Sequence, residues 1–166
     1  MRDKFIENWG VDNPSKSDLV KDKVKSTNID KFVFERQAGE VGKKIVKRNI
    51  GKVFTESEGA VVYIPEEGRK DINTSVFINS QGYPTYEAKD LGLIKMKFDE
   101  FNPDESIFVT DNEQIQHFKV VFDACVRLGD RFLGDKWNTW TGRSKHITHG
   151  RMTYKGQKMS SRLGGV

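Results

Sequence analysis

The sequence has very little cysteine: Cys125 is the one cysteine among 166 residues. A single cysteine excludes an internal disulfide and any zinc site built from cysteines. Long apolar runs are also lacking, and none approaches the roughly 20 residues that a membrane-spanning helix needs. The first nine residues have no apolar segment of the kind found in secretory signals. These absences favour a disulfide-free globular chain of the cytoplasm, with a length that suits one domain.

Acidic residues are missing from the C-terminal part of the chain, where none follows Asp135. The seven basic residues that do follow it are Lys136, Arg143, Lys145, Arg151, Lys155, Lys158 and Arg162. Because the whole chain has a net charge of +4, this +7 segment leaves −3 for residues 1–135. The distribution predicts an anionic ligand at the C-terminal end. A solvated basic tail is the alternative, but glycine, serine and apolar residues interrupt the basic ones and argue against it.

The hydrophobic pattern predicts alternating strands and helices after a polar lead-in. Residues 1–28 are polar and of mixed charge, with a short helix expected near 17–25. The further elements expected are helices over 40–49, 86–98 and 112–128 and strands over 59–65, 74–79, 106–110 and 146–152. Strands that alternate with helices are typical of a parallel sheet with crossover helices. The predicted fold class is therefore α/β.

Capping residues and apolar stripes set the expected ends and buried faces of the helices. Gly51 and Gly129 are expected to end the first and third helices, and Thr85 to cap the second. The side chains expected to be buried are Val41, Ile45 and Val46 in the first helix, Leu91, Ile94, Phe98 and Phe101 in the second, and Ile115, Phe118, Val121 or Phe122, Cys125 and Leu128 in the third. Residues 130–144 are expected to be irregular.

Three loops are candidate binding sites, because ligands of open parallel sheets collect beyond the carboxyl ends of the strands. They cover residues 80–90, residues 111–117, and residues 149–150 together with 155–162. In the first loop, Tyr86 and Asp90 are four residues apart and project from the same side of a helix. A carboxylate beside a phenol suits a cationic ligand such as a guanidinium. Spacing alone favours the alternative, a helix-start carboxylate next to a packing tyrosine.

The second loop carries Gln114 and His117 one helical turn apart. Glutamine offers both a donor and an acceptor for positioning a polar substrate. A solvated first-turn glutamine and a packing histidine are the commoner interpretations. By itself, this loop does not indicate a function.

The third loop carries the strongest signal, the string Lys-Met-Ser-Ser-Arg over residues 158–162. The Lys158 ammonium, the Ser160 and Ser161 hydroxyls and the backbone N–H groups suit phosphate oxygens, including charge that develops on a polyphosphate during displacement. A basic terminus is the alternative. The complete five-residue string, with methionine in place, favours the functional interpretation.

This string resembles the signature loop of class I aminoacyl-tRNA synthetases, and three upstream segments narrow the resemblance to the arginyl-tRNA synthetases. Residues 79–92 are similar to the start of that family's tyrosine-to-aspartate helix. Residues 53–63 are similar to the segment before that helix, and residues 114–118 to the start of the next one. The resemblance covers roughly residues 30–166, with several motifs in the right order. It implies a Rossmann-like fold and an arginine–tRNA ligase.

The resemblance also implies roles for individual residues. Asp90 and Tyr86 would hold the guanidinium of L-arginine, and Gln114 would help to position the amino acid. A fixed carboxylate favours a planar guanidinium over the point charge of lysine. The residues that would line the ATP site on its adenine side are His149, Gly150 and Met152. Lys158 would stabilise the transition state as arginine displaces pyrophosphate from Mg-ATP, in a loop shaped by Ser160, Ser161 and Arg162, before the activated arginine is transferred to tRNA.

Two departures from the family pattern indicate that only part of the enzyme is present. The sequence has no His-x-Gly-His motif for ATP, and no helical anticodon-binding domain follows Val166. We therefore expect residues 29–166 to be the second half of a nucleotide-binding catalytic domain, a partial Rossmann-like parallel sheet preceded by the 1–28 lead-in or insertion. Such a half sheet exposes an edge and apolar faces. We expect the missing N-terminal half and anticodon-binding domain to be its partners, and the chain to be inactive alone.

Two other functions remain open at this point. A non-catalytic nucleotide- or RNA-binding module could use the aromatic rings of Trp137 and Trp140 beside Arg143 and Lys145. Another class I synthetase is the second alternative, because the signature loop is shared among these enzymes.

Overall fold

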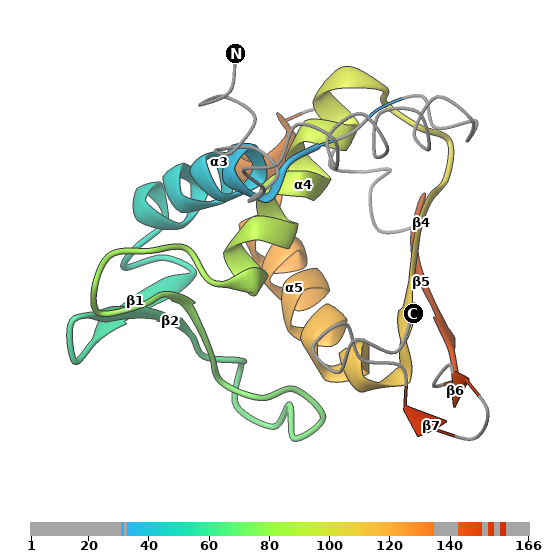
Figure 1. Ribbon diagram of the computed structural model, residues 1–166. Coiled ribbons are helices and arrows are strands. Elements are labelled where there is room, and N and C mark those ends of the chain that lie inside the picture. Colours follow the sequence, from blue (N-terminus) through green and yellow to red (C-terminus); the bar gives the residue numbers. More distant parts are fainter. Residues whose placement is uncertain (1–30, 32, 135–142, 151–152, 155–156, 159–166) are drawn as a thin grey trace, which may run out of the picture.

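The computed structural model describes residues 31, 33–134, 143–150, 153–154 and 157–158 (Figure 1). The expected lead-in over 1–28, with its helix near 17–25, lies outside the described residues. Within the described part of the chain, no helix is long and apolar enough to cross a membrane.

Two helices, α3 (Glu35–Arg48) and α4 (Tyr86–Glu100), cross at very short range (Figure 1). Gly42 and Gly92 lie at the crossing. A Cβ placed on Gly42 would lie 1.7 Å from the carbonyl oxygen of Ala88, which is far inside van der Waals contact. The absence of side chains at the two glycines is therefore what lets the backbones approach.

The bounds of α3 differ from the prediction of a helix over 40–49. The helix begins five residues earlier and ends one residue earlier. Gly39 and Gly42 each lower helix propensity by roughly 1 kcal/mol relative to alanine. The sequence therefore gives only a weak helix signal for the first turns of α3. Gly51 does take a positive φ of 78°, but in the turn that follows the helix and not at its end. Packing on α4 outweighs the poor propensity of the glycines.

The first sheet is an antiparallel one of order β1-β2-β3, formed by β1 (Phe54–Ser57), β2 (Ala60–Tyr63) and β3 (Ser75–Ile78). The strands expected over 59–65 and 74–79 are both present. The prediction that the second of them joins the parallel sheet is wrong, because β3 pairs antiparallel with β2. The connection between β2 and β3 holds a turn and no crossover helix, and such a connection favours antiparallel pairing.

The second sheet is the expected parallel one, formed by β4 (Ser106–Asp111) and β5 (Ser144–His149). The two strands run in register along their whole length, so their last residues lie opposite each other. β5 begins two residues and ends three residues before the expected strand over 146–152. This pair and its crossover helix confirm the α/β fold class. A short hairpin, β6 (Thr153–Tyr154) and β7 (Gln157–Lys158), follows β5.

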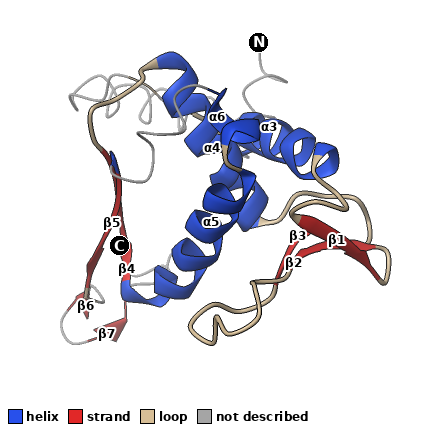
Figure 2. Cartoon of the chain, turned by 180° about the vertical axis from the view of Figure 1, so that it is seen from behind, coloured by secondary structure: helices blue, strands red, loops and turns tan. Residues whose placement is uncertain are grey.

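The crossover between the parallel strands consists of η1 (Asn112–Gln114), α5 (Ile115–Leu128) and α6 (Asp130–Leu133). The long helix α5 runs through the middle of the molecule, with the parallel pair on one side and the antiparallel sheet on the other (Figure 2). α5 ends at Gly129, as predicted. The short helix α6 lies in a stretch that was expected to be irregular.

One continuous cluster of buried side chains joins the helices to both sheets. The predicted core residues that are fully or nearly buried are Val46, Leu91, Ile94, Phe98, Phe118, Val121, Cys125 and Leu128. Phe122, Val41 and Ile45 are partly buried. The prediction is wrong for Phe101 and Ile115, which are 53% and 40% exposed. Both stand at helix ends, outside the span that neighbouring elements cover.

One face of the parallel pair is apolar and open. Ile107 and Val109 of β4 and Ile147 of β5 are 42%, 65% and 49% exposed. Val109 and Ile147 are register partners, so they form one patch. Among the described strands, β4 pairs with β5 alone. The expected exposed apolar face is therefore present on β4 and β5.

Candidate functional site

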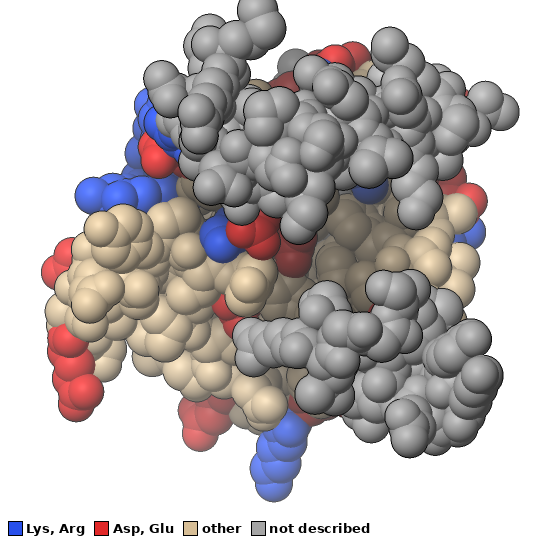
Figure 3. All heavy atoms as spheres, in the orientation of Figure 1, with Lys and Arg blue, Asp and Glu red and all other residues tan. Residues whose placement is uncertain are grey.

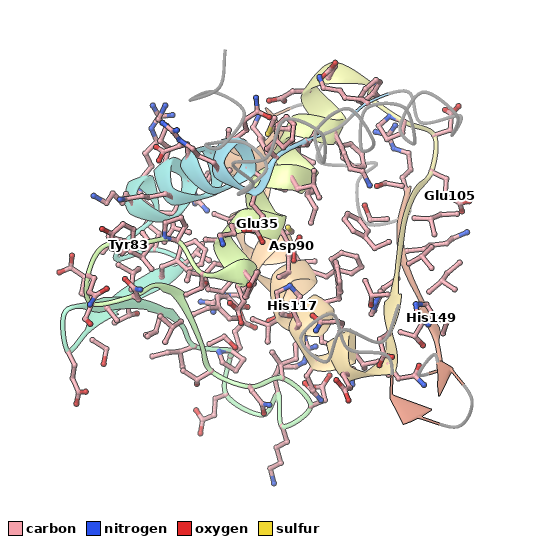
Figure 4. All side chains as sticks on the ribbon, in the orientation of Figure 1. Glu35, Tyr83, Asp90, Glu105, His117 and His149 are labelled. Carbon is pink, nitrogen blue, oxygen red and sulfur yellow. The ribbon has the colours of Figure 1, made fainter. Side chains whose placement is uncertain are left out.

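A pocket of about 430 Å³ lies where α4 meets the start of α5. Its lining residues are Tyr86, Glu87 and Asp90 of α4, Glu113 and Gln114 of η1, and His117 of α5. The first two candidate loops thus contribute to one site. Acidic side chains lie in the recessed middle of the face seen in Figure 3, and Figure 4 labels Asp90 and His117 in that part of the molecule.

Helical spacing explains why these side chains meet. Tyr86 and Glu87 lie one turn before Asp90, and residues three or four apart share a face of a helix. Gln114 stands three residues before His117, so these two side chains also project to a common side. The contact between α4 and α5 then brings the two faces together.

Polar side chains connect the start of each pocket-lining helix, η1 and α4, to a strand. Asp111, the last residue of β4, accepts a hydrogen bond from the Glu113 N–H at 2.9 Å and so begins η1. Thr85 was expected to cap α4. It does stand at the N-cap position, but its side chain makes no capping hydrogen bond. Its hydroxyl donates to the carbonyl oxygen of Val76 in β3 at 2.7 Å. The pocket is therefore held between the ends of two strands from different sheets.

The central contact of the pocket joins His117 to Asp90. The imidazole Nε2 lies 2.5 Å from Oδ2 of Asp90, and Nδ1 lies 3.8 Å from Oε1 of Glu87. The side chain of His117 is only 13% exposed. Two carboxylates thus face the two ring nitrogens of one nearly buried histidine.

Burial and ion pairing act in opposite directions on these groups. Burial alone lowers the pKa of His117, but the hydrogen bond with Asp90 and the charges of Asp90 and Glu87 outweigh it and raise the pKa to about 9. Burial alone raises the pKa of Glu87, and interactions with His117 and the backbone outweigh it, so the pKa is lowered. The histidine is therefore an imidazolium at neutral pH and the glutamate is ionised.

A second histidine lies behind the first. His146 of β5 stacks on Phe118 with ring centroids 4.3 Å apart, and its Nε2 is 2.8 Å from Oγ1 of Thr110. Burial and the positive charge of His117 both lower the pKa of His146. The second ring is therefore neutral at neutral pH, and the positive charge is confined to His117.

Tyr86 stands at the open mouth of the pocket. Its side chain is 66% exposed and not a packing residue. The Lys89 ammonium lies 4.6 Å from the centroid of its ring and 3.2 Å from Oε2 of Glu35. The phenol ring therefore makes a cation–π contact with Lys89 within the chain.

The sequence pattern described as "tRNA synthetases class I (R), catalytic domain" matches residues 16–166. The chain belongs to this family. It is 34% identical over 173 residues to an arginine–tRNA ligase of Borrelia garinii subsp. bavariensis, a match that covers 97% of this chain and 28% of the relative. It is 31% identical to an arginine–tRNA ligase of Borreliella afzelii, covering 98% and 27%. The chain thus spans about 28% of the length of these curated relatives.

Two solved structures share the fold. The arginyl-tRNA synthetase of Plasmodium falciparum matches with a TM-score of 0.60 and 22% identity, over 82% of this chain and 23% of that one. A putative arginyl-tRNA synthetase of Campylobacter jejuni matches with a TM-score of 0.56 and 20% identity, over 98% and 40%. The α/β architecture is therefore that of a class I synthetase catalytic domain.

The third loop of this class I catalytic domain is described in part. His149 ends β5 opposite Asp111, at the same edge of the sheet as η1, and it is exposed together with Gly150. Lys158 belongs to β7. The other predicted residues of this loop, which lie outside the described residues, are Met152, Ser160, Ser161 and Arg162.

Sequence reasoning missed three pocket residues. Glu87 and Glu113 were not singled out, and His117 was interpreted as a packing residue. The spacing of Glu87 and Asp90 on one helix face, and of Gln114 and His117 on another, is the signal that was available. The contact between the two faces is not encoded in either spacing.

The basic residues invoked for an RNA-binding module make contacts within the chain. Arg143 donates from Nη1 to the carbonyl oxygen of Pro103 at 2.7 Å. Lys145 pairs with the carboxylate of Glu105. Trp137 and Trp140 lie outside the described residues.

Proposed function

We propose that the chain forms the arginine-binding part of an arginine–tRNA ligase catalytic domain, which activates L-arginine with ATP and attaches it to its tRNA. The observation that carries the proposal is the pocket in which Tyr86, Asp90 and Gln114 meet. These are the three residues to which the family resemblance assigns the amino acid.

The charge of the pocket supports a cationic ligand. Three carboxylates line it, those of Glu87, Asp90 and Glu113, beside one imidazolium, that of His117. Asp90 can accept a bidentate pair of hydrogen bonds from a guanidinium. A planar fork uses both carboxylate oxygens, so arginine is favoured over lysine.

We place ATP beyond the carboxyl ends of β4 and β5. The adenine side would be lined by His149, Gly150 and Met152. Lys158 would stabilise negative charge on the phosphates, in a loop formed with Ser160, Ser161 and Arg162. The position of His149 opposite Asp111 supports this assignment, because it puts the start of this segment at the same sheet edge as the arginine pocket.

Magnesium is proposed to enter with the phosphates of ATP, where it would neutralise their charge. Within the described residues, no group of three or more His, Cys, Asp or Glu side chains is arranged to hold a metal ion. The site residues proposed for this chain are those that bind arginine, adenine and phosphate.

The remaining parts of the enzyme are proposed as partners. We propose that residues 29–166 are one part of the catalytic domain, after a lead-in or insertion over 1–28, and that the open face of β4 and β5 receives the part that precedes it. The chain alone is expected to bind arginine or ATP weakly and not to aminoacylate tRNA. The cytoplasm is the proposed compartment, because its tRNA substrate is used there.

Binding of L-arginine by the purified chain tests the proposal. Asp90→Asn should weaken binding by about tenfold or more, since a hydrogen bond to a charged partner contributes roughly 1.5–3 kcal/mol. Asp99→Asn is the matched control, because Asp99 lies on the same helix and pairs with Lys95 outside the pocket. Titration calorimetry or ligand-observed NMR gives both affinities, with L-lysine as the competing amino acid. Equal affinity of the wild type and Asp90→Asn for arginine would refute the assignment.

A further inference from the structure

The arginine pocket already contains a cation of its own. His117 places a protonated ring nitrogen 2.5 Å from Asp90, the carboxylate assigned to the ligand. The ring is nearly buried, and the pocket opens directly onto it. A guanidinium that reaches Asp90 must therefore approach this imidazolium.

We infer that His117 is the resident counter-ion of Asp90, which holds the carboxylate in position and competes with the guanidinium of the ligand for it. This inference rests on the proposed function, because it takes Asp90 as the ligand's partner. It adds His117 as a residue that sets the affinity of the pocket for a guanidinium ligand and the pH dependence of that affinity.

The groups that surround His117 come from three elements of the fold. From α4 it is faced by Glu87 and Asp90, and from β5 by the neutral ring of His146, while Glu113 of η1 lines the same pocket. The charge of Asp90 also acts on the Lys97 ammonium of α4. When His117 loses its proton, the pocket loses one positive charge and the competitor for Asp90 disappears.

Two cations on one carboxylate repel each other, so ligand binding and proton binding are linked. The ligand favours the deprotonated state of His117, and by reciprocity deprotonation favours the ligand. Binding of a permanent cation should therefore tighten as the pH rises from 7 towards the pKa of His117, which is about 9. Above that pH the affinity should become constant.

Methylguanidinium is the probe of choice, because it keeps its charge throughout this pH range and has no α-amino group. At constant ionic strength, we expect the wild-type chain to bind it about tenfold or more tightly at pH 9 than at pH 7. His117→Gln keeps a neutral donor for Asp90 but removes the charge. This variant should bind more tightly than the wild type at pH 7 and with a flat pH profile, whereas Asp99→Asn should reproduce the wild-type profile.

A second measurement needs no variant. The ring resonances of His117 should titrate near pH 9 in the free chain and at a lower pH with saturating methylguanidinium. Unmoved resonances, pH-independent wild-type binding, or loss of binding in His117→Gln at every pH would overturn the inference. Binding that is pH-independent but lost in Asp90→Asn overturns only the role of His117. If neither the wild type nor His117→Gln binds methylguanidinium, or if Asp90→Asn binds it as tightly as the wild type, the proposed arginine site is overturned as well.

Discussion

The imidazole of His117 and the carboxylate of Asp90 are joined across the interface of α5 and α4, 2.5 Å apart in space and 27 positions apart in the sequence. The contact is both an ion pair within the fold and the base of the proposed arginine pocket. It therefore links the stability of the chain to its ligand chemistry.

The raised pKa of His117 predicts that stability falls in mildly alkaline solution. The group titrates near 6.5 when unfolded and near 9 when folded, so its contribution is complete below pH 6.5 and is lost as the pH rises through 9. A shift of this size corresponds to at most roughly 3 kcal/mol. Urea unfolding of the wild type between pH 6.5 and 10 should show the decline, and Asp90→Asn should show much less of it.

The decisive quantity in that experiment is the difference in the free energy of unfolding between the wild type and Asp90→Asn at each pH. Burial lowers the pKa of Lys97 and the charge of Asp90 raises it, so Lys97 contributes a pH dependence opposite in sign to that of His117 in both chains. Asp90→Asn removes this charge and lowers the pKa of Lys97 further, which adds to the expected difference between the two curves. Parallel curves for the wild type and Asp90→Asn would show that the histidine is not stabilised by this carboxylate.

The helix crossing predicts a large effect of a very small change. Gly42→Ala would bring a methyl group to 1.7 Å from the backbone oxygen of Ala88, which cannot rotate away. The helices must separate, at a cost of about 2–3 kcal/mol in the free energy of unfolding. Gly39→Ala is the matched control on the same helix, because its nearest contact is a proline ring carbon at 3.2 Å. Denaturant unfolding should separate the two variants by at least about 1 kcal/mol, and equal stabilities would contradict the crossing.

The open face of the parallel pair predicts self-association of the isolated chain. Val109 and Ile147 lie side by side on this face and are 65% and 49% exposed. Exposed apolar patches promote contact between copies. Sedimentation velocity should show concentration-dependent association that Val109→Lys reduces. Thr55→Lys, an exposed substitution on β1, should leave it unchanged, and a wild-type chain that stays monomeric at every concentration would count against the patch.

The signature loop predicts a specific loss of chemistry. In an enzyme reconstituted with the missing parts, Lys158→Ala should lower arginine- and tRNA-dependent ATP–pyrophosphate exchange about 100-fold or more. RNA affinity should change little, because one lysine among many contributes only a small share of phosphate contacts. Lys70→Ala, an exposed residue of the turn after β2, serves as the control. A parallel loss of RNA affinity and no loss of exchange would favour the RNA-binding module.

Local sequence patterns predicted much of the fold. The expected strands at β2, β3 and β4, the start of α4 at Tyr86 and the stop of α5 at Gly129 all depend on hydrophobic periodicity and on turn residues within one segment. The start of α3 was missed because its glycines serve a contact with α4 and not the helix itself. The partners of β3 were missed because pairing is a property of two segments.

The sequence by itself determined the family, through short strings of residues whose chemistry depends on their order along the chain. It also identified Tyr86, Asp90 and Gln114 as candidates, through the resemblance of residues 79–92 and 114–118 to that family. Only the tertiary structure decided that these residues share a pocket and that His117 is the ionic partner of Asp90. The physical reason is that ion pairing depends on distance in space and on burial, and the packing of α5 on α4 sets both.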